Sequence, residues 1–153
     1  MSGDARLVRL LDERAIERKL AQFARLLDAR AWSQLEDVFA ADVAFDYALG
    51  EQRGLEALRA TMRRFLDPCG PSQHLIGNVV VDVDDDRAVS RAYVQARHQT
   101  PDAALQGVYD ASGEYVDTWA RGAAGWRIIR REATWSIHSG NPAILGANAA
   151  DLG

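Results

Sequence analysis

The spacing of apolar residues in this 153-residue chain changes once, near its middle, and this change constrains the fold most. Up to about residue 66 apolar residues recur every three or four positions, the period of a helix with one buried face. From residue 72 onward they alternate or form β-branched runs, as strands do. Helices followed by strands predict an α+β domain with helices packed on one face of an antiparallel sheet.

Three helices are expected in the first half. The first covers 12–30, with Asp12 as its N-cap and an apolar stripe that includes Ile16 and Leu20. A short strand is expected between the second and third helices. The expected ranges are 32–39 for the second helix, 43–48 for the strand and 55–66 for the third helix, which Asp67-Pro68-Cys69-Gly70-Pro71 ends.

Four strands are expected in the second half, in two hairpins. The turns are the acidic stretch at 84–86 and the glycine-containing stretch at 122–125. No repeat or linker interrupts the chain, so a single domain over 1–153 is expected, with its body at about 8–137 and a tail at 139–153 that is loose unless it docks. The expected strand ranges are 72–83, 87–100, 105–120 and 126–138.

Composition excludes several classes of protein. A net charge of −4 and a pI near 5.3 argue against nucleic acid or an anionic membrane as the partner. Cys69 is the only cysteine, which excludes an internal disulfide and a closed Cys-rich zinc site. A zinc or iron site made of histidines and carboxylates stays open on composition alone. Neither a dinucleotide-binding nor a P-loop pattern is present. The apolar runs are short and residues 1–5 have no leader character, so a cytoplasmic location is expected.

The histidines of the expected strands share faces with small apolar residues. His98 lies on the face of Ala96 and Val94, and His74 on that of Ile76, Asn78 and Val80, because side chains alternate along a strand. A face that mixes small residues with isolated polar groups suits a cavity wall. Each histidine taken alone is also compatible with a structural role.

Asp28 stands at the C-terminal end of the first helix, where the helix dipole disfavours a carboxylate by about 0.3–1 kcal/mol. Two explanations remain open: exposure at a fraying helix end, or a hydrogen bond accepted from a histidine. Tyr47 fits either a core position or a site, and Tyr115 and Trp135 fit the core or a cavity wall. His138, near the tail, is expected to be structural or exposed.

Several short motifs, in order, resemble the SnoaL-like branch of the nuclear-transport-factor-2-like superfamily over about 8–137. Each motif alone is weak evidence, but their order and spacing together are fairly specific for this fold. The motifs are Leu27-Asp28-Ala29-Arg30-Ala31-Trp32, Val38-Phe39-Ala40-Ala41-Asp42, Phe45-Asp46-Tyr47, Ser72-Gln73-His74-Leu75-Ile76-Gly77-Asn78, Gly113-x-Tyr115-x-Asp117 and Gly125-Trp126-Arg127-Ile128. The resemblance implies a cone: a curved antiparallel sheet that wraps a deep apolar pocket, with the three N-terminal helices packed on it.

Within that branch the chain is most similar to scytalone dehydratase-like enzymes. The similarity implies four catalytic residues: Asp28, Tyr47, His74 and His98. The chain departs from the pattern of those enzymes at two positions. Leu27 stands where they have a tyrosine, and Tyr115 stands near the position of their active-site asparagine. The expected substrate-contacting residues are Phe23, Leu27, Trp32, Asn78, Tyr115 and Trp135.

Together with the resemblance, these residues predict a cofactor-independent lyase of the dehydratase type, which acts on a small hydrophobic cyclic, polyketide-like or steroid-like substrate. Asp28 would orient His74, His74 would remove a proton from carbon, Tyr47 would donate to the developing oxyanion, and His98 would assist as a second donor. An isomerase or polyketide-type cyclase using the same base, and a non-catalytic binding subunit, remain alternatives. No cofactor or metal is expected. A homodimer or homotrimer is expected, through the outer strand face that carries Arg91, Tyr93, Gln95 and Arg97.

Overall fold

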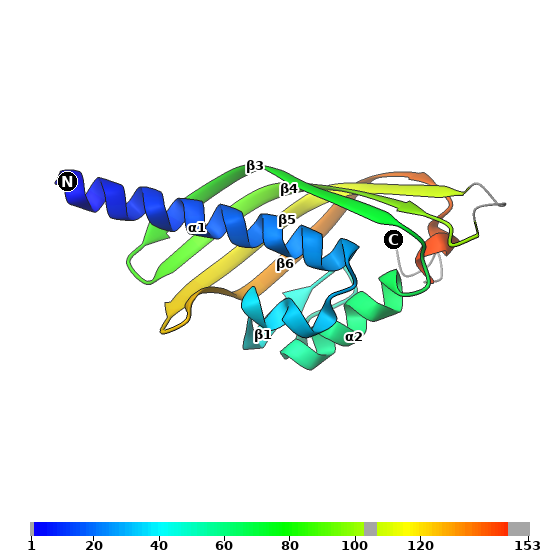
Figure 1. The fold of residues 1–153 in the computed structure, drawn as a ribbon, viewed down its shortest axis with the longest axis horizontal. Coiled ribbons are helices and arrows are strands. Elements are labelled where there is room, and N and C mark those ends of the chain that lie inside the picture. The colour runs from blue at the N-terminus through cyan, green and yellow to red at the C-terminus, as the bar shows by residue number, and fades with distance from the viewer. Residues whose placement is uncertain (1, 103–106, 147–153) are drawn as a thin grey trace.

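A computed structural model describes residues 2–102 and 107–146, and its elements follow the expected order of helices and then strands (Figure 1). The helices and two short strands of the first half build one side of the molecule, and the four long strands of the second half build the rest. The elements are α1 (Gly3–Asp28), the 3₁₀ helix η1 (Trp32–Asp37), β1 (Phe39–Asp46), β2 (Gln52–Arg53), α2 (Leu55–Leu66), β3 (Ser72–Asp84), β4 (Arg87–Gln99), β5 (Val108–Gly122), β6 (Gly125–Gly140) and η3 (Pro142–Leu145).

The strands form one curved, open sheet of six strands in the order β2-β1-β6-β5-β4-β3. Neighbours are antiparallel except β1 and β6, which run parallel. α1 lies along one face of the sheet, and η1 and α2 continue that layer beside β1 (Figure 1). The predicted α+β architecture is therefore confirmed.

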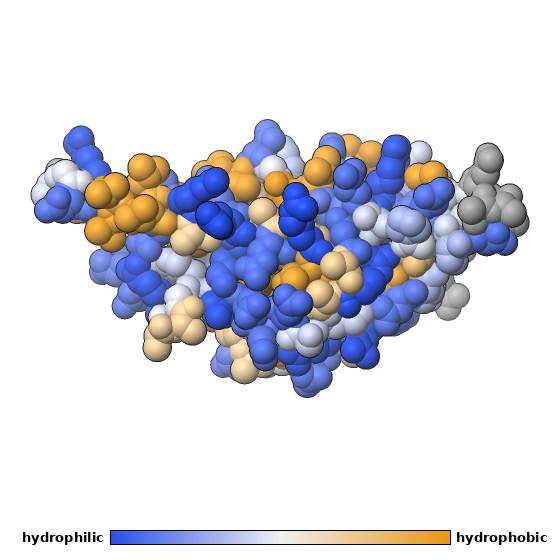
Figure 2. Space-filling model, in the orientation of Figure 1, coloured by the Kyte–Doolittle hydropathy of each residue, from blue (hydrophilic) through white to orange (hydrophobic). Residues whose placement is uncertain are grey.

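α1 begins nine residues before the predicted start. The Ser2 hydroxyl caps it by accepting a hydrogen bond from the backbone N–H of Ala5, at 3.3 Å. The prediction of Asp12 as the N-cap was wrong, because its carboxylate instead accepts hydrogen bonds from Arg121 Nη1 and Trp126 Nε1 at 2.6 and 3.0 Å. The first turns of α1 carry a patch of exposed apolar side chains, which Figure 2 shows at the N-terminal end of the helix. Its members are Leu7, Val8, Leu10 and Leu11.

A bulge in β3 changes which residues share a face with His74, and one prediction was therefore wrong. Gly77 pairs with Tyr93 and Val80 with Arg91, so Asn78 and Val79 together oppose a single residue of β4. Asn78 takes a left-handed φ of 51°, and the alternation flips beyond it. Asn78 and Val80 are consequently exposed, not on the face of His74 as predicted.

Other boundaries moved by a few residues. β1 is Phe39–Asp46, not 43–48, and the second helix is a 3₁₀ helix that ends at Asp37. The start of the predicted strand 105–120 and the last part of the tail, 147–153, lie outside the described residues. The first part of the tail completes β6 and forms η3, whose Ile144 and Leu145 are buried. No described helix is long and apolar enough to cross a membrane.

Candidate active site

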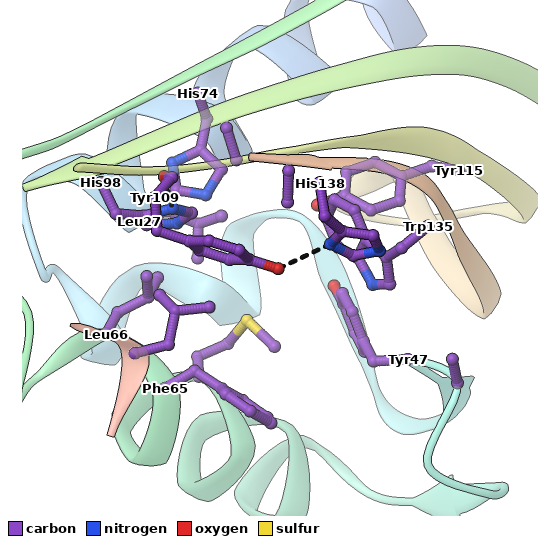
Figure 3. Close-up of a pocket in the computed structure, with 15 residues that line it drawn as sticks. Leu27, Tyr47, Phe65, Leu66, His74, His98, Tyr109, Tyr115, Trp135 and His138 are labelled. Atoms are coloured by element: carbon purple, nitrogen blue, oxygen red, sulfur yellow. Dashed lines mark hydrogen bonds between the residues drawn. The ribbon is translucent and has the colours of Figure 1, made fainter. Parts of the chain in front are cut away.

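A largely apolar pocket lies between the helix-covered face of the sheet and α2 (Figure 3). The end of α1, the segment that follows β1, α2, all four long strands and η3 contribute to its wall. Polar groups are few, and three of them are histidines. The lining residues are Leu27, Tyr47, Ala48, Met62, Phe65, Leu66, His74, Ala96, His98, Tyr109, Ala111, Tyr115, Trp135, His138 and Leu145.

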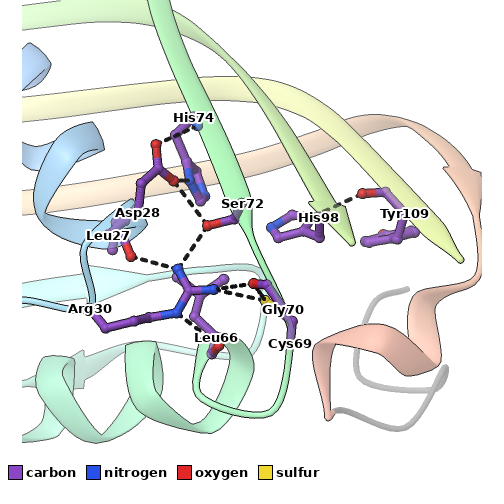
Figure 4. Close-up of polar contacts among 10 residues, drawn as sticks. All are labelled: Leu27, Asp28, Arg30, Leu66, Cys69, Gly70, Ser72, His74, His98 and Tyr109. Atoms are coloured by element: carbon purple, nitrogen blue, oxygen red, sulfur yellow. Dashed lines mark hydrogen bonds and ion pairs between the residues drawn. The ribbon is translucent and has the colours of Figure 1, made fainter. Parts of the chain in front are cut away.

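The structure brings Asp28 and His74 together, although they are 46 residues apart in the chain (Figure 4). His74 Nδ1 lies 2.6 Å from Asp28 Oδ1, and the backbone N–H of His74 donates to Oδ2 at 3.0 Å. A carboxylate only accepts, so the hydrogen of the neutral ring sits on Nδ1. Nε2 of His74 is then left as an unprotonated acceptor at the pocket wall.

A half-buried arginine, Arg30, supports this carboxylate through the hydroxyl of Ser72. Arg30 Nη1 donates to Ser72 Oγ at 2.8 Å, and Ser72 Oγ donates to Asp28 Oδ1 at 3.0 Å. The Arg30 guanidinium also donates to the carbonyls of Leu27 and Leu66, at the ends of α1 and α2 (Figure 4). These contacts satisfy carbonyls that the helices leave unpaired, and they place a positive charge where the helix dipole favours one.

The protonation of Asp28 reflects these contacts. Burial raises its pKa, but hydrogen bonds from the ring and backbone N–H of His74, the charge of His74 and the hydroxyl of Ser72 outweigh burial. The pKa of Asp28 therefore lies below its usual range, and the carboxylate is ionised at neutral pH. Of the two explanations for a carboxylate at this helix end, the structure agrees with the hydrogen bond to histidine.

His98 lies beside His74, with ring centroids 5.5 Å apart, and is 3% exposed. Its Nδ1 is 3.0 Å from the carbonyl oxygen of Tyr109, so Nδ1 carries the hydrogen. Burial lowers the pKa of His98 to about 4, with further lowering by the charges of His74 and Arg30. Its Nε2 therefore accepts hydrogen bonds at neutral pH, which corrects the prediction that His98 is a second donor.

Tyr47 contacts a buried ion pair, Arg131 with Asp117, that the sequence did not predict. Arg131 binds Asp117 through two hydrogen bonds of 2.7 Å, and its Nη1 donates to Tyr47 Oη at 3.3 Å. The guanidinium stacks between aromatic rings, 4.4 Å from the centroid of Phe23 and 4.0 Å from that of Tyr115. Because Tyr47 Oη accepts from Arg131, its own hydrogen is free to donate into the pocket.

Charge and burial keep these groups in one protonation state. Burial lowers the pKa of Arg131, but the charge and hydrogen bonds of Asp117, together with the influence of Tyr47 and Tyr115, outweigh burial and raise the pKa overall. Burial also raises the pKa of Tyr47, more than Arg131 lowers it. Tyr47 is thus a neutral hydroxyl donor. The position of Asp117 could have indicated this pair from the sequence. Asp117 shares one strand face with Tyr115 and Trp119, and a carboxylate on a buried face requires a buried cation.

The structure places six of the predicted substrate and catalytic residues in the pocket lining: Leu27, Tyr47, His74, His98, Tyr115 and Trp135. Asp28 lies directly behind His74. Three others lie elsewhere, which corrects their assignment to this pocket. Phe23 is fully buried against Arg131, Trp32 donates its indole N–H to Asp67 at 2.9 Å, and Asn78 is in the exposed bulge.

The pocket also holds Tyr109 and His138, to which no catalytic role was assigned. A bulge in β6 explains why the sequence did not place His138 in the pocket. Gly113 pairs with Trp135 and Ser112 with Ile137, so Ser136 is extra, and the alternation of β6 flips after it. Both Trp135 and His138 consequently reach the pocket. Among residues 2–102 and 107–146, no group of three or more His, Cys, Asp or Glu side chains is placed to hold a metal ion.

Comparisons with known proteins agree with this fold. The SnoaL-like domain family matches residues 8–132. An uncharacterized protein of Mycobacterium tuberculosis is 31% identical over 125 residues, covering 80% of this chain and 84% of that protein.

Solved structures show the same architecture at lower identity. A candidate scytalone dehydratase from Novosphingobium aromaticivorans superposes with a TM-score of 0.77 at 24% identity, covering 92% of each chain. A hexachlorocyclohexane dehydrochlorinase, LinA type 2, gives a TM-score of 0.76 at 16% identity over 88% of this chain and 92% of that one. An NTF2-like superfamily protein from Salmonella enterica gives 0.73 at 14% identity over 84% and 94%. The chain therefore belongs to the SnoaL-like domain family and has the fold of the NTF2-like superfamily.

Proposed function

We propose that this protein is a cofactor-independent lyase that removes water from a small hydrophobic cyclic hydroxy ketone of polyketide-like or steroid-like character. The observation that carries the proposal is the 2.6 Å contact between Asp28 and His74 at the wall of an apolar pocket. Two structural neighbours are named for eliminations, a candidate dehydratase and a dehydrochlorinase, which supports the same reaction class here.

The first step is proton removal. Nε2 of His74 takes a proton from the carbon next to the substrate carbonyl, and Asp28 stabilises the imidazolium that forms. Arg30 and Ser72 keep the carboxylate aligned during this change. A base positioned in this way contributes about 10²–10⁴ in rate.

The second requirement is stabilisation of the oxyanion that develops on the carbonyl oxygen. The hydroxyl of Tyr47 donates to it, because Arg131 already occupies one acceptor position of that oxygen. His98, neutral at pH 7, accepts a hydrogen bond from a substrate hydroxyl and so favours hydroxylated ligands over purely apolar ones.

The test is conversion of a panel of cyclic β-hydroxy ketones, including β-hydroxytetralone, followed by mass analysis. The proposal predicts loss of one water, and a loss of turnover of about 10² or more in His74→Ala. The control is Gln73→Ala, on the same strand but exposed on the opposite face, which should keep full activity. Products of unchanged mass would identify an isomerase or cyclase instead. No conversion of any panel member, or full activity in His74→Ala, would refute the lyase.

A further inference from the structure

We propose that Tyr109 is a second catalytic residue of this pocket, the general acid that protonates the departing hydroxyl, and that His138 acts through it as the source of the proton. The inference rests on the proposed elimination, which it divides between two acid–base pairs. It begins from the hydrogen bond between Tyr109 Oη and His138 Nδ1, 2.6 Å long, between two residues that both line the pocket.

The pair lies apart from Asp28 and His74. Four rings follow one another along the wall: His74, His98, Tyr109 and His138, with successive centroids 5.5, 5.8 and 6.1 Å apart. Figure 3 shows the Tyr109 side chain extending from the His98 side, with its hydroxyl directed at His138. A ring-shaped substrate between the two pairs would present one carbon to His74 and its leaving oxygen to Tyr109.

The surroundings of the two residues suit a proton relay. Tyr109 is 2% exposed, and burial raises its pKa, so it holds its proton until a strong acceptor forms. His138 is exposed, so its ring is in contact with solvent. His98 cannot replace it, because its Nδ1–H is bound to the carbonyl of Tyr109 and its pKa is about 4.

The proposed step balances as follows. His74 Nε2 takes the carbon proton, the electron pair of that C–H bond forms the new double bond, and the C–O bond breaks with its pair on oxygen. Tyr109 Oη gives its proton to that oxygen, which leaves as water, and receives a proton from Nδ1 of the His138 imidazolium. His138 becomes neutral and regains a proton from solvent, while His74 releases one to solvent.

A leaving-group comparison tests this step. The variants Tyr109→Phe and His138→Gln are assayed with β-hydroxytetralone and β-acetoxytetralone, following the naphthol that forms from either. Hydroxide needs protonation to leave, whereas acetate does not. Both variants should lose about 10² or more in turnover of the hydroxy ketone and retain turnover of the acetoxy ketone close to that of the unsubstituted protein. Gln preserves a hydrogen bond to Tyr109 but supplies no proton, so a purely structural role would survive His138→Gln.

Each remaining outcome has a distinct meaning. Equal losses with both ketones would overturn the acid role of Tyr109, and no loss with either would assign both proton transfers to His74. His74→Ala should be slow with both ketones, because each needs a base. If His74→Ala retains activity, or the unsubstituted protein converts neither ketone, the proposed function itself fails. Tyr93→Phe, a tyrosine that is 60% exposed outside the pocket, is the matched control and should behave as the unsubstituted protein.

Discussion

Replacing His98 should change how the stability of the fold depends on pH. In the folded state the pKa of His98 is about 4, because burial disfavours the charged ring, whereas an unfolded chain titrates near 6.5. Between these values the unfolded state binds a proton that the folded state does not. Stability is therefore fully present above pH 6.5 and is lost as the pH falls toward 4.

The size of the effect follows from the two values. A difference from 6.5 to about 4 corresponds to about 3 kcal/mol in total, of which about 2 kcal/mol is lost between pH 7 and pH 4.5. His98→Asn removes the titration, and its amide keeps a donor near the carbonyl of Tyr109. The decline in stability between these pH values should therefore be about 2 kcal/mol smaller in His98→Asn than in the unsubstituted protein.

Urea unfolding at pH 7, 6, 5 and about 4.5, followed by circular dichroism, measures this difference. Ala96→Gly is the matched control, since Ala96 lies on the same strand and face, is 3% exposed and does not titrate. It should lower stability by a similar amount at every pH. Identical pH dependence in His98→Asn and the unsubstituted protein would show that the folded state protonates His98 as readily as the unfolded chain does, which refutes the reasoning.

Three further outcomes are expected. Tyr47→Phe should lower turnover by about 10² without unfolding the protein, because it removes one oxyanion donor but leaves the Arg131–Asp117 pair intact; unchanged turnover would exclude Tyr47 from that role. Asn78→Val should lower the free energy of unfolding by about 1 kcal/mol, since a β-branched residue is strained at φ 51°, and should leave turnover unchanged; a loss of turnover would restore Asn78 to the site. We propose a dimer or trimer through the outer sheet face, where Tyr93 is 60% and Leu75 59% exposed, and a clean monomer in sedimentation at micromolar concentration would contradict it.

Periodicity predicted most of the fold because each long element buries one face. The helix at Leu55–Leu66 and the turn between β3 and β4 fall where the pattern placed them. It failed at the start of α1, where several apolar side chains are exposed and cap chemistry at Ser2 sets the boundary. It also failed at the two bulges, since an extra residue reverses every side chain that follows.

The candidate site divides in the same way. The position of Asp28 at a helix C-terminus left two explanations open, exposure or a contact with a histidine, and it was the resemblance to scytalone dehydratase-like enzymes that singled out His74 as the partner that the structure shows. Arg131 was missed because it lies among charged neighbours in sequence, and only the packing of β5 against β6 shows it to be the buried partner of Asp117. His138 was missed because its direction depends on the bulge at Ser136.

The central claim is that Asp28 and His74 act as one acid–base unit. The most direct measurement is the turnover of β-hydroxytetralone by Asp28→Asn, His74→Ala and the double variant, all checked for folding. Each single change should cost about 10² or more, because one misplaces the ring tautomer and the other removes the base. The double variant should lose little beyond the worse single variant, since groups that act as a unit are not additive. Losses that multiply in the double variant would show that the two residues act independently, and would contradict the account.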